Sequence, residues 1–369
     1  MATEVREKTK TDQAANEMGL DGFEFVEFTH PDPEQMARLF EMLGFSHVAT
    51  HKSKPIRRYA QGDINFLLNM ETGGQPAMFR DTRGPSACAM GFRVKDADAA
   101  LQLAVERGAT PARRDCGPGE LDIPAIEGIG GAHVMFVDRY GSETIYDRDF
   151  EPTGKGKDDN SVGLKDLDHL THNLKRGNMS VWADYYENIF NFREIRYFDI
   201  EGQSTGLFSK AMTAPDEKIR IPLNESQDDH SQIEEFIREY KGEGIQHIAL
   251  STEDIFDTVD KLRANGVRFQ DSPDTYYEML DSRLPGHGHD VKEMHKRKIL
   301  IDGSPETGEG LLLQIFTENM VGPIFFEIIQ RKGNDGFGEG NFKALFESIE
   351  LDQIRRGVIP ASKDAGDAA

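Results

Sequence analysis

Two segments of this chain repeat each other without a gap: Asp96-Ala-Asp-Ala-Ala-Leu-Gln-Leu-Ala-Val-Glu-Arg-Gly108 and Asp254-Ile-Phe-Asp-Thr-Val-Asp-Lys-Leu-Arg-Ala-Asn-Gly266. In both, an Asp suited to the N-cap precedes apolar residues at helical spacing, and a Gly follows 12 residues after that Asp. The pattern predicts the same helix in each half of the chain. Such internal repetition determines the architecture, because each copy is one supersecondary unit.

The residues around these segments extend the likeness to the two halves of the chain. In the first half, a β-like run at 23–28 precedes a helix pattern at 32–44, with Asp32 as the expected N-cap. In the second half, a β-like run at 167–174 precedes a helix pattern at 181–192. Each half is therefore predicted to contain two modules of strand, helix and strands, and we expect an α+β fold.

Polar stretches divide the chain. Residues 1–20 and 358–369 lack apolar periodicity and are expected to be disordered tails. The polar stretch at 151–162 predicts an interdomain linker. We therefore predict an N-terminal domain at 21–150 and a C-terminal domain at 163–357, in agreement with a length of 369 residues.

The composition excludes several classes of partner. The 65 acidic and 43 basic residues give a formal net charge of −22, which repels phosphate backbones and anionic lipids. The first ten residues are polar where a secretory signal would be apolar, and no run of about 20 apolar residues occurs. We therefore expect a cytoplasmic protein without nucleic-acid or membrane partners. Two cysteines are too few for a cysteine-rich metal site.

Three short apolar segments of the second half each carry one potential metal ligand at their centre. These ligands are His169 in Asp-Leu-Asp-His-Leu-Thr-His, His247 in Gly-Ile-Gln-His-Ile-Ala-Leu, and Glu327 in Pro-Ile-Phe-Phe-Glu-Ile-Ile-Gln. An ionisable group in an apolar strand costs free energy unless it is paired. Two imidazoles and one carboxylate leave coordination positions open, as a non-heme Fe(II) oxygenase requires. The sequence therefore predicts a metal site in the second half.

One strand offers two candidate histidines. His169 and His172 are three residues apart, so their side chains face opposite sides of a strand and only one can line the site. The residues alone do not decide which. Aligning the two halves, with Gly141 placed against Gly322, pairs Phe25 with His169, Ala89 with His247, and Tyr146 with Glu327. Only the second half is predicted to keep the ligands, which leaves the first half as a scaffold or an oligomer surface.

Three other motifs are weaker candidates for sites. His287 and His289 lie in a Gly/Pro-rich stretch that is expected to be a solvent loop. His295 lies in a charge run typical of a solvated helix face or loop. The glycines of 333–342 suggest a phosphate-binding loop, but no Lys-Ser/Thr follows them and no βαβ unit surrounds them. We assign no site to these segments.

Longer motifs follow one another through the second half. They are Arg220-Ile-Pro-Leu-Asn-Glu225, Gly244-Ile-Gln-His-Ile-Ala-Leu250, Asp274-Thr-Tyr-Tyr-Glu-Met-Leu280, Leu311-Leu-Leu-Gln-Ile-Phe316, Phe325-Phe-Glu-Ile-Ile-Gln-Arg-Lys-Gly333 and Gly336-Phe-Gly-Glu-Gly-Asn-Phe-Lys-Ala-Leu-Phe346. They closely resemble the 4-hydroxyphenylpyruvate dioxygenase family, and the likeness runs from about residue 20 to 357. The resemblance implies two domains of paired βαβββ modules, as in the vicinal-oxygen-chelate (glyoxalase-like) superfamily. It also selects His169 over His172 as the first ligand.

The resemblance implies a specific chemistry. Fe(II) is expected at His169, His247 and Glu327. The substrates are expected to be 4-hydroxyphenylpyruvate and O₂, converted to homogentisate and CO₂ by oxidative decarboxylation, ring hydroxylation and side-chain migration. The reaction would serve tyrosine and phenylalanine catabolism. A homo-oligomer, either a dimer or a tetramer, is implied as well.

The resemblance also implies substrate contacts and a C-terminal lid helix at about 341–357. The expected contacts are Ser209, Pro222, Asn224, Gln232, Gln246, Gln314, Phe316, Phe337, Asn341, Phe342 and Phe346. Gln246 adjoins His247 and is expected on the opposite strand face, where it could support the ligand instead of contacting substrate. Asn341 is the expected N-cap of the lid helix, whose apolar face follows helical spacing.

Three other functions compete with this one. Hydroxymandelate synthases resemble the same family, but Pro222, Asn224 and Phe342 are of the dioxygenase type. Ring-cleaving extradiol dioxygenases use a similar triad, but they leave the C-terminal motifs unexplained. A metal-free binding protein of the same fold would have no need for an intact set of three ligands.

Overall fold

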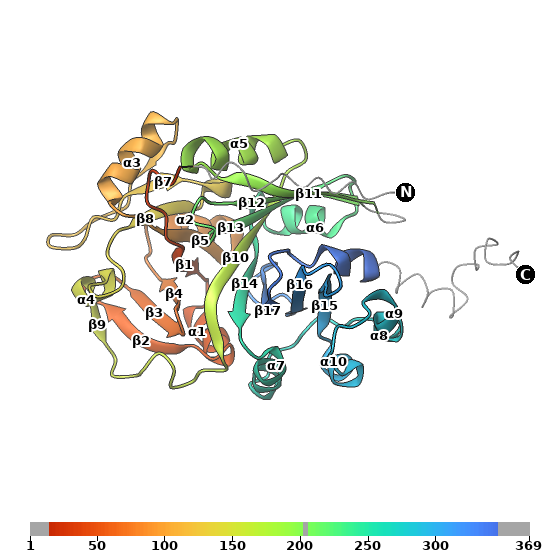
Figure 1. The fold of residues 1–369 in the computed structure, drawn as a ribbon. Coiled ribbons are helices and arrows are strands. Elements are labelled where there is room, and N and C mark those ends of the chain that lie inside the picture. Colours follow the sequence, from red (N-terminus) through yellow and green to blue (C-terminus); the bar gives the residue numbers. More distant parts are fainter. Residues whose placement is uncertain (1–14, 202–205, 346–369) are drawn as a thin grey trace, which may run out of the picture.

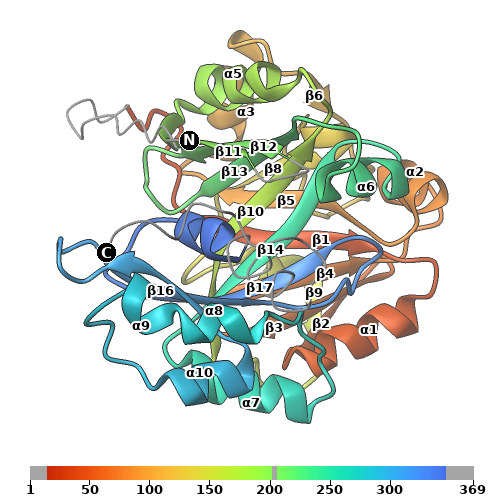
Figure 2. The ribbon, with the colours of Figure 1, turned by 90° about the vertical axis from the view of Figure 1, so that its right-hand side faces the viewer.

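The computed structural model describes residues 15–201 and 206–345 of the chain. It contains two mixed sheets, one from each half, which lie side by side with helices packed around them (Figure 1). In the view turned by 90°, elements of the two halves overlap, with α3 behind α5 at the top (Figure 2). Among the described residues, no helix has the length and apolar character to cross a membrane.

The first half forms a nine-stranded sheet in the order β6-β7-β8-β5-β1-β4-β3-β2-β9. Its elements are β1 (Phe23–Thr29), α1 (Pro33–Met42), β2 (Ser46–His51), β3 (Ile56–Gln61), β4 (Ile64–Asn69), α2 (Gly74–Arg83), β5 (Ser86–Arg93), α3 (Ala97–Glu106), β6 (Pro111–Ala112), β7 (Ala125–Glu127), the 3₁₀ turn η1 (Ile129–Gly131), β8 (His133–Val137), α4 (Ile145–Asp149) and β9 (Phe150–Pro152). Because β9 pairs with β2, the first sheet extends two residues into the predicted linker.

The second half forms an eight-stranded sheet in the order β11-β12-β13-β10-β14-β17-β16-β15. Its elements are β10 (Leu164–Leu174), α5 (Met179–Phe190), β11 (Arg193–Glu201), β12 (Gly206–Thr213), β13 (Arg220–Ser226), α6 (Gln232–Glu239), β14 (Gly244–Thr252), α7 (Ile255–Ala264), α8 (Asp274–Glu278), α9 (Leu280–Arg283), α10 (Val291–Arg297), β15 (Leu300–Ser304), β16 (Gly310–Phe316) and β17 (Phe325–Lys332). Residues 339–345 are also helical.

The repeated helices begin and end as the sequence predicts. Asp32, Asp96 and Asp254 each occupy the N-cap of α1, α3 and α7, where the side chain accepts a hydrogen bond from a backbone N–H two or three residues on. Past the helix ends, Gly44 and Gly266 adopt φ values of 88° and 92°, a region that disfavours residues with a Cβ. The predicted modular α+β architecture is therefore confirmed.

The pairing register of the central strands shows which residues of the two halves correspond. Glu27 pairs with Ala89 in the first sheet, as Thr171 pairs with His247 in the second. Two residues back along β1 and β10, Phe25 therefore corresponds to His169. These are the two pairings predicted for the histidine ligands, and both are confirmed.

The counterpart predicted for Glu327 is wrong. Strand β8 pairs with β5 as β17 pairs with β14, and this register makes Met135 the counterpart of Glu327. Tyr146 lies instead on α4, after the strand has ended. The first half still lacks the ligand set, because its three corresponding positions carry Phe25, Ala89 and Met135.

One apolar core runs through both halves. The largest cluster of buried side chains includes Phe66 of β4 and Phe326 of β17, whose ring centroids lie 5.9 Å apart. The buried Gln61 side chain adds a polar connection, because its Oε1 accepts a hydrogen bond from the Val162 N–H at 2.7 Å. The two sheets are therefore packed together, which fixes the frame that carries the site.

His172 faces this core and gives a prediction for acid stability. It is fully buried, its Nε2 lies 2.8 Å from the Tyr186 hydroxyl, and burial lowers its pKa to about 3. The unfolded chain takes up a proton near pH 6.5 and the folded chain does not, so the free energy of unfolding should fall as pH drops from about 6.5 to about 3.

Replacing His172 and Tyr186 together with phenylalanine should make this fall shallower, by up to about 1.4 kcal/mol per pH unit. The double change avoids leaving the tyrosine hydroxyl without its partner. Urea unfolding of metal-free protein between pH 6.5 and 4.5 measures the slope. Equal slopes in the two proteins would show that His172 does not titrate in this way.

Candidate metal centre

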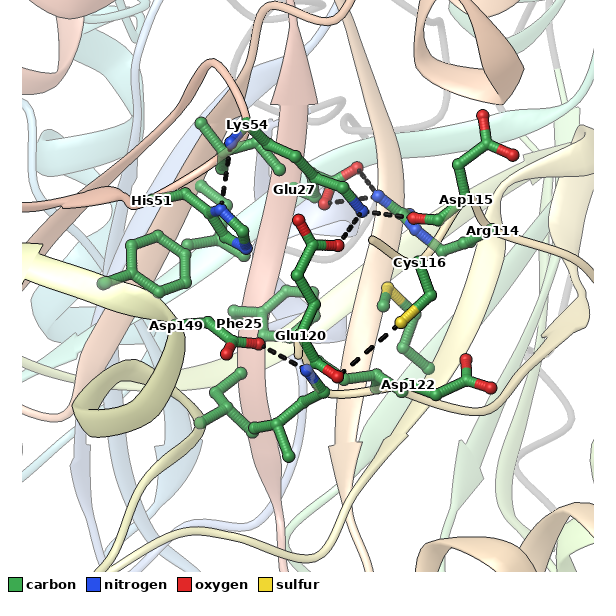
Figure 3. Close-up of a pocket in the computed structure, with 17 residues that line it drawn as sticks. Phe25, Glu27, His51, Lys54, Arg114, Asp115, Cys116, Glu120, Asp122 and Asp149 are labelled. Carbon is green, nitrogen blue, oxygen red and sulfur yellow. Dashed lines mark hydrogen bonds and ion pairs between the residues drawn. The ribbon is translucent and has the colours of Figure 1, made fainter. Parts of the chain in front are cut away.

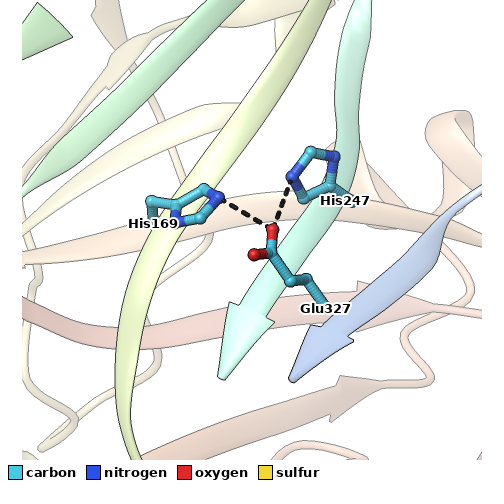
Figure 4. Close-up of side chains that lie close together, drawn as sticks. All are labelled: His169, His247 and Glu327. Carbon is cyan, nitrogen blue, oxygen red and sulfur yellow. Dashed lines mark ion pairs between the residues drawn. The ribbon is translucent and has the colours of Figure 1, made fainter. Parts of the chain in front are cut away.

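Three neighbouring strands bring the predicted ligands together. His169 lies on β10, His247 on β14 and Glu327 on β17, and their ligand atoms all lie within 4.8 Å of one another (Figure 4). Both His169 and Glu327 pair in register with Ala249 of β14, which lies between them in the sheet. Because side chains alternate along a strand, all three ligands project from one face of the sheet.

The donor set fits a divalent cation. The Nε2 atoms of His169 and His247 lie 3.2 and 3.3 Å from Glu327 Oε2, and the second carboxylate oxygen, Oε1, is buried without a hydrogen-bond partner. Leaving a buried carboxylate oxygen unpaired costs free energy unless an ion or a ligand satisfies it. Two imidazoles and one carboxylate suit a first-row metal with open coordination positions.

Each histidine is oriented by the residue immediately before it. His169 Nδ1 lies 2.8 Å from Asp168 Oδ1, and His247 Nδ1 lies 2.6 Å from Gln246 Oε1. Both oxygens can only accept, so Nδ1 carries the proton in each ring and Nε2 offers its lone pair to the centre. The Thr171 hydroxyl lies 2.9 Å from His247 Nε2, beside the centre.

The electrostatics of the centre favour a cation. Burial opposes protonation of His169, but the nearby Glu327 and Asp168 carboxylates outweigh it and raise its pKa. Burial alone dominates at His247 and lowers its pKa. Burial would raise the pKa of Glu327, yet the two histidines hold it below its usual value. A metal ion would compete with the proton on His169, so metal binding should weaken as pH falls.

A pocket opens beside these ligands, with about 470 Å³ of empty space that includes its opening to solvent. Its walls come from β11, β12, β13 and β16 and from the segment that leads into the helical residues 339–345. Besides the ligands, it is lined by Thr171, Phe198, Leu207, Ser209, Pro222, Asn224, Phe316, Phe337, Glu339 and Phe342. Aromatic side chains and a few polar groups therefore surround a space next to the candidate metal.

Six of the predicted substrate contacts line this pocket, namely Ser209, Pro222, Asn224, Phe316, Phe337 and Phe342. Gln246 does not line it and instead orients His247, the alternative expected from its place on the strand. Gln314 is buried on the same face of β16 as Phe316 and packs beneath Gly338. Its Oε1 has no hydrogen-bond partner in the described part of the chain.

Two predicted contacts are placed elsewhere. Gln232 is exposed on the first turn of α6, where the helix directs its side chain to solvent. It is not among the described residues that line the pocket. Asn341 is buried and its Oδ1 accepts a hydrogen bond from the Tyr276 hydroxyl at 2.6 Å. Asn341 is not an N-cap, since residues 339 and 340 are already helical. Phe346 and most of the predicted lid helix lie outside the described residues.

Several residues of the site were not predicted from the sequence. Asp168 and Thr171 lie on either side of His169 in the same strand. Their place next to a predicted ligand was the feature of the sequence that could have identified them. Phe198 and Leu207 come from β11 and β12, where no motif marks them. Phe325 stacks on the His247 ring, with centroids 4.9 Å apart and planes 16° from parallel.

The rejected histidines do not form a second centre. Within the described ranges, His169, His247 and Glu327 are the one group of metal-binding side chains that lie close enough together. His295 lies on α10 beside Asp274, as expected of a solvated helix. His287 is buried beside Asp281, so the prediction of a solvent loop is wrong for that residue.

The first half has a pocket at the corresponding place, with different chemistry. Apolar side chains, including Phe25 and Met135, form much of its wall. Glu27, the counterpart of Thr171, is buried there and accepts hydrogen bonds at 2.8 and 3.0 Å from Arg114 Nη2 (Figure 3). Apolar residues thus occupy the positions that hold ligands in the second half, and an internal ion pair lies beside them in the same pocket.

Comparison with known proteins agrees with this division. Residues 14–151 match the family described as hydroxyphenylpyruvate dioxygenase, N-terminal, and residues 166–280 match the glyoxalase/bleomycin resistance protein/dioxygenase superfamily. The 4-hydroxyphenylpyruvate dioxygenase of Pseudomonas aeruginosa is 61% identical over 93% of this chain and 97% of its own. Hemolysin VllY of Vibrio vulnificus is 59% identical over 94% of this chain and 98% of its own.

A solved structure extends the likeness to the fold. A fusion of a xylose isomerase-like TIM barrel with a 4-hydroxyphenylpyruvate dioxygenase superposes with a TM-score of 0.75 and 31% identity. The match covers 90% of this chain and 53% of the fusion protein. With sequence identity near 60% along almost its whole length, the chain belongs to the 4-hydroxyphenylpyruvate dioxygenase family.

Proposed function

We propose that this protein is an Fe(II)-dependent dioxygenase that converts 4-hydroxyphenylpyruvate and O₂ to homogentisate and CO₂. The observation that carries the proposal is the convergence of His169, His247 and Glu327 on one point at the floor of an aromatic-lined pocket. The P. aeruginosa relative, which carries this enzyme name, supports the choice of substrate. We further propose that the enzyme is cytoplasmic and forms a dimer or tetramer.

The two imidazoles and the carboxylate would hold the iron, which would supply a Lewis-acidic, redox-active site where the keto acid and O₂ meet. Two neutral imidazoles and one carboxylate leave a formal charge near +1, which an anionic keto acid offsets. The low exposure of the ligands strengthens this attraction, because little water screens it.

The remaining pocket residues would orient the ring. Phe316, Phe337 and Phe342 offer apolar walls on which a phenol ring can pack. Ser209 and Asn224 pair across β12 and β13, so their polar groups lie together in the wall of the pocket. Small misplacement of the ring is costly in rate, so these contacts would decide which carbon reacts.

Product analysis tests the function. Purified protein loaded anaerobically with Fe(II) should consume O₂ when 4-hydroxyphenylpyruvate is added, and should release homogentisate and CO₂ in equal amounts. Hydroxymandelate in place of homogentisate would indicate the synthase reaction. No O₂ uptake and no charge-transfer absorption with Fe(II) and substrate would favour a metal-free binding protein.

Gln246 supplies a prediction that separates ligand support from substrate contact. Replacing it with alanine removes the acceptor for His247 Nδ1–H, and loss of such outer partners typically weakens metal affinity by about 10- to 100-fold. At saturating iron, the KM for 4-hydroxyphenylpyruvate should stay within about twofold of the wild-type value. Unchanged iron affinity with a strongly raised KM would instead place Gln246 in contact with substrate.

A further inference from the structure

Arg331 joins two parts of the site that different segments supply. It lies on β17, on the same strand face as Glu327. Its Nε and Nη2 donate to the two oxygens of Asp168, each at 2.7 Å. Its Nη1 donates to the backbone carbonyls of Asn334 at 3.0 Å and Gly336 at 2.6 Å. One guanidinium thus ties β10 to the loop that follows β17.

The Asp168 end of this connection reaches the first ligand. The same Oδ1 that accepts from Arg331 also accepts from His169 Nδ1–H at 2.8 Å. The side chains of Asp168 and Arg331 are only 6% and 16% exposed, so water competes little with the pair. A bidentate, charge-assisted pair of this kind fixes orientation as well as adding energy.

The loop end reaches the pocket wall. The Arg331 guanidinium lies 5.7 Å from the Phe337 ring centroid, and the Phe337 ring meets the His169 ring edge-on with centroids 5.2 Å apart. The Phe337 N–H donates to Glu339 Oε2 at 2.8 Å, where the helical residues 339–345 begin. The loop held by Arg331 therefore places an aromatic wall directly against a metal ligand.

We propose that Arg331 is a positioning residue that couples the metal centre to the C-terminal wall of the pocket. By holding Asp168 and the 334 and 336 carbonyls at once, it makes the ligating orientation of His169 and the observed position of the wall favour each other. Such coupling is reciprocal, so metal binding should stabilise the wall as much as the wall stabilises the bound metal. The inference rests on the proposed metal-dependent function.

Arg220 provides a matched control for charge. Its Nη1 lies 3.7 Å from Asp168 Oδ2, so its removal also takes a cation away from Asp168. Unlike Arg331, it has no hydrogen bond to the 334 or 336 carbonyl among those that the structure describes, and it contacts that loop only through a long ion pair of 3.7 Å with the exposed Asp335 carboxylate. If Arg331 only balances the charge of Asp168, replacing either arginine should have similar effects on metal affinity and on exchange of the wall. If Arg331 couples the two, only its replacement should have these effects.

The test uses Co(II), a redox-stable divalent ion, with the full-length chain. Co(II) affinity is measured by calorimetry, and amide hydrogen exchange of 334–345 is measured with and without the ion. In the wild type, Co(II) should slow exchange of this segment. Arg331→Ala should weaken Co(II) binding by about 10- to 100-fold and abolish the metal-dependent slowing. Arg220→Ala should change affinity by less than about threefold and keep the slowing.

Arg331→Lys keeps the charge, but three donors on one nitrogen cannot make the four hydrogen bonds of Arg331, among them the bidentate pair with Asp168. This variant should recover part of the Co(II) affinity without recovering the metal-dependent slowing of exchange. If Arg331→Ala does not fold, Arg331→Lys takes its place in the test. Wild-type slowing in either Arg331 variant, or equal losses in Arg220→Ala, would overturn the coupling. Failure of the wild type to bind Co(II) would instead refute the metal-dependent function itself.

Discussion

Glu327→Gln should remove metal binding and, with it, turnover. The substitution keeps the shape of the side chain but replaces the one anionic ligand with a neutral amide, so the centre loses the charge that balances the cation. We expect iron affinity to fall by more than about 100-fold, beyond the range for partners outside the ligand set. Calorimetric titration with Fe(II) under anaerobic conditions, together with the rate of O₂ uptake, measures both effects.

Glu318→Gln is the matched control, because it makes the same chemical change at a half-exposed side chain that pairs with Arg268. That variant should bind iron and turn over like the wild type. Thermal unfolding of the metal-free proteins shows whether Glu327→Gln is folded. A folded Glu327→Gln protein with near-normal iron affinity would rule out Glu327 as a ligand.

Shortening the chain after Gly340 should abolish turnover in a protein that still folds. The truncation removes Phe342, which lines the pocket, and leaves the space beside the ligands open to water. A loss of more than about 100-fold in kcat is expected, because small errors in ring placement are costly. Steady-state O₂ uptake at saturating iron gives kcat, and circular dichroism reports the fold.

A chain shortened after Gly357 is the control and should keep full activity. The truncation after Gly340 also removes Asn341, which accepts a hydrogen bond from the buried Tyr276 hydroxyl. Part of the loss in that variant would therefore come from lower stability. Phe342→Ala in the full-length chain keeps that hydrogen bond and should still lower kcat. Wild-type turnover in the chain that ends at Gly340 would count against any role of this segment as a lid.

Local sequence patterns predicted the repeated helices and the ligands well. The N-caps Asp32, Asp96 and Asp254 could be predicted because N-capping depends only on the local sequence, namely a short polar side chain just before an apolar helical pattern. His169, His247 and Glu327 were readable because each interrupts an apolar strand, where an ionisable group needs a partner. Their convergence required the register of three strands, and the repeat gave correct counterparts only for the strands of His169 and His247.

Features that depend on connections between strands were harder to predict. Tyr146 was matched to Glu327 through Gly141 and Gly322, yet Gly141 follows β8 whereas Gly322 precedes β17. Glycines in loops mark turns and do not fix strand register. Only the pairing of β8 with β5 identifies Met135 as the counterpart.

Contacts between segments that are distant in the sequence could not be predicted either. Asp168 stands beside a predicted ligand, but its pairing with Arg331 depends on the packing of β10 near the end of β17. Burial would raise the pKa of Asp168, and the Arg331 guanidinium outweighs it and holds that pKa well below its usual range. Gln232 was carried over from a family position, but the start of α6 turns it to solvent.

A crystal structure of the protein loaded anaerobically with Fe(II) is the most direct test of the central claim. Anomalous diffraction at the iron edge should reveal one ion per chain, bound by Nε2 of His169, Nε2 of His247 and a carboxylate oxygen of Glu327. An iron ion bound elsewhere, or these three side chains free of metal in protein shown to contain one equivalent of iron, would contradict the account.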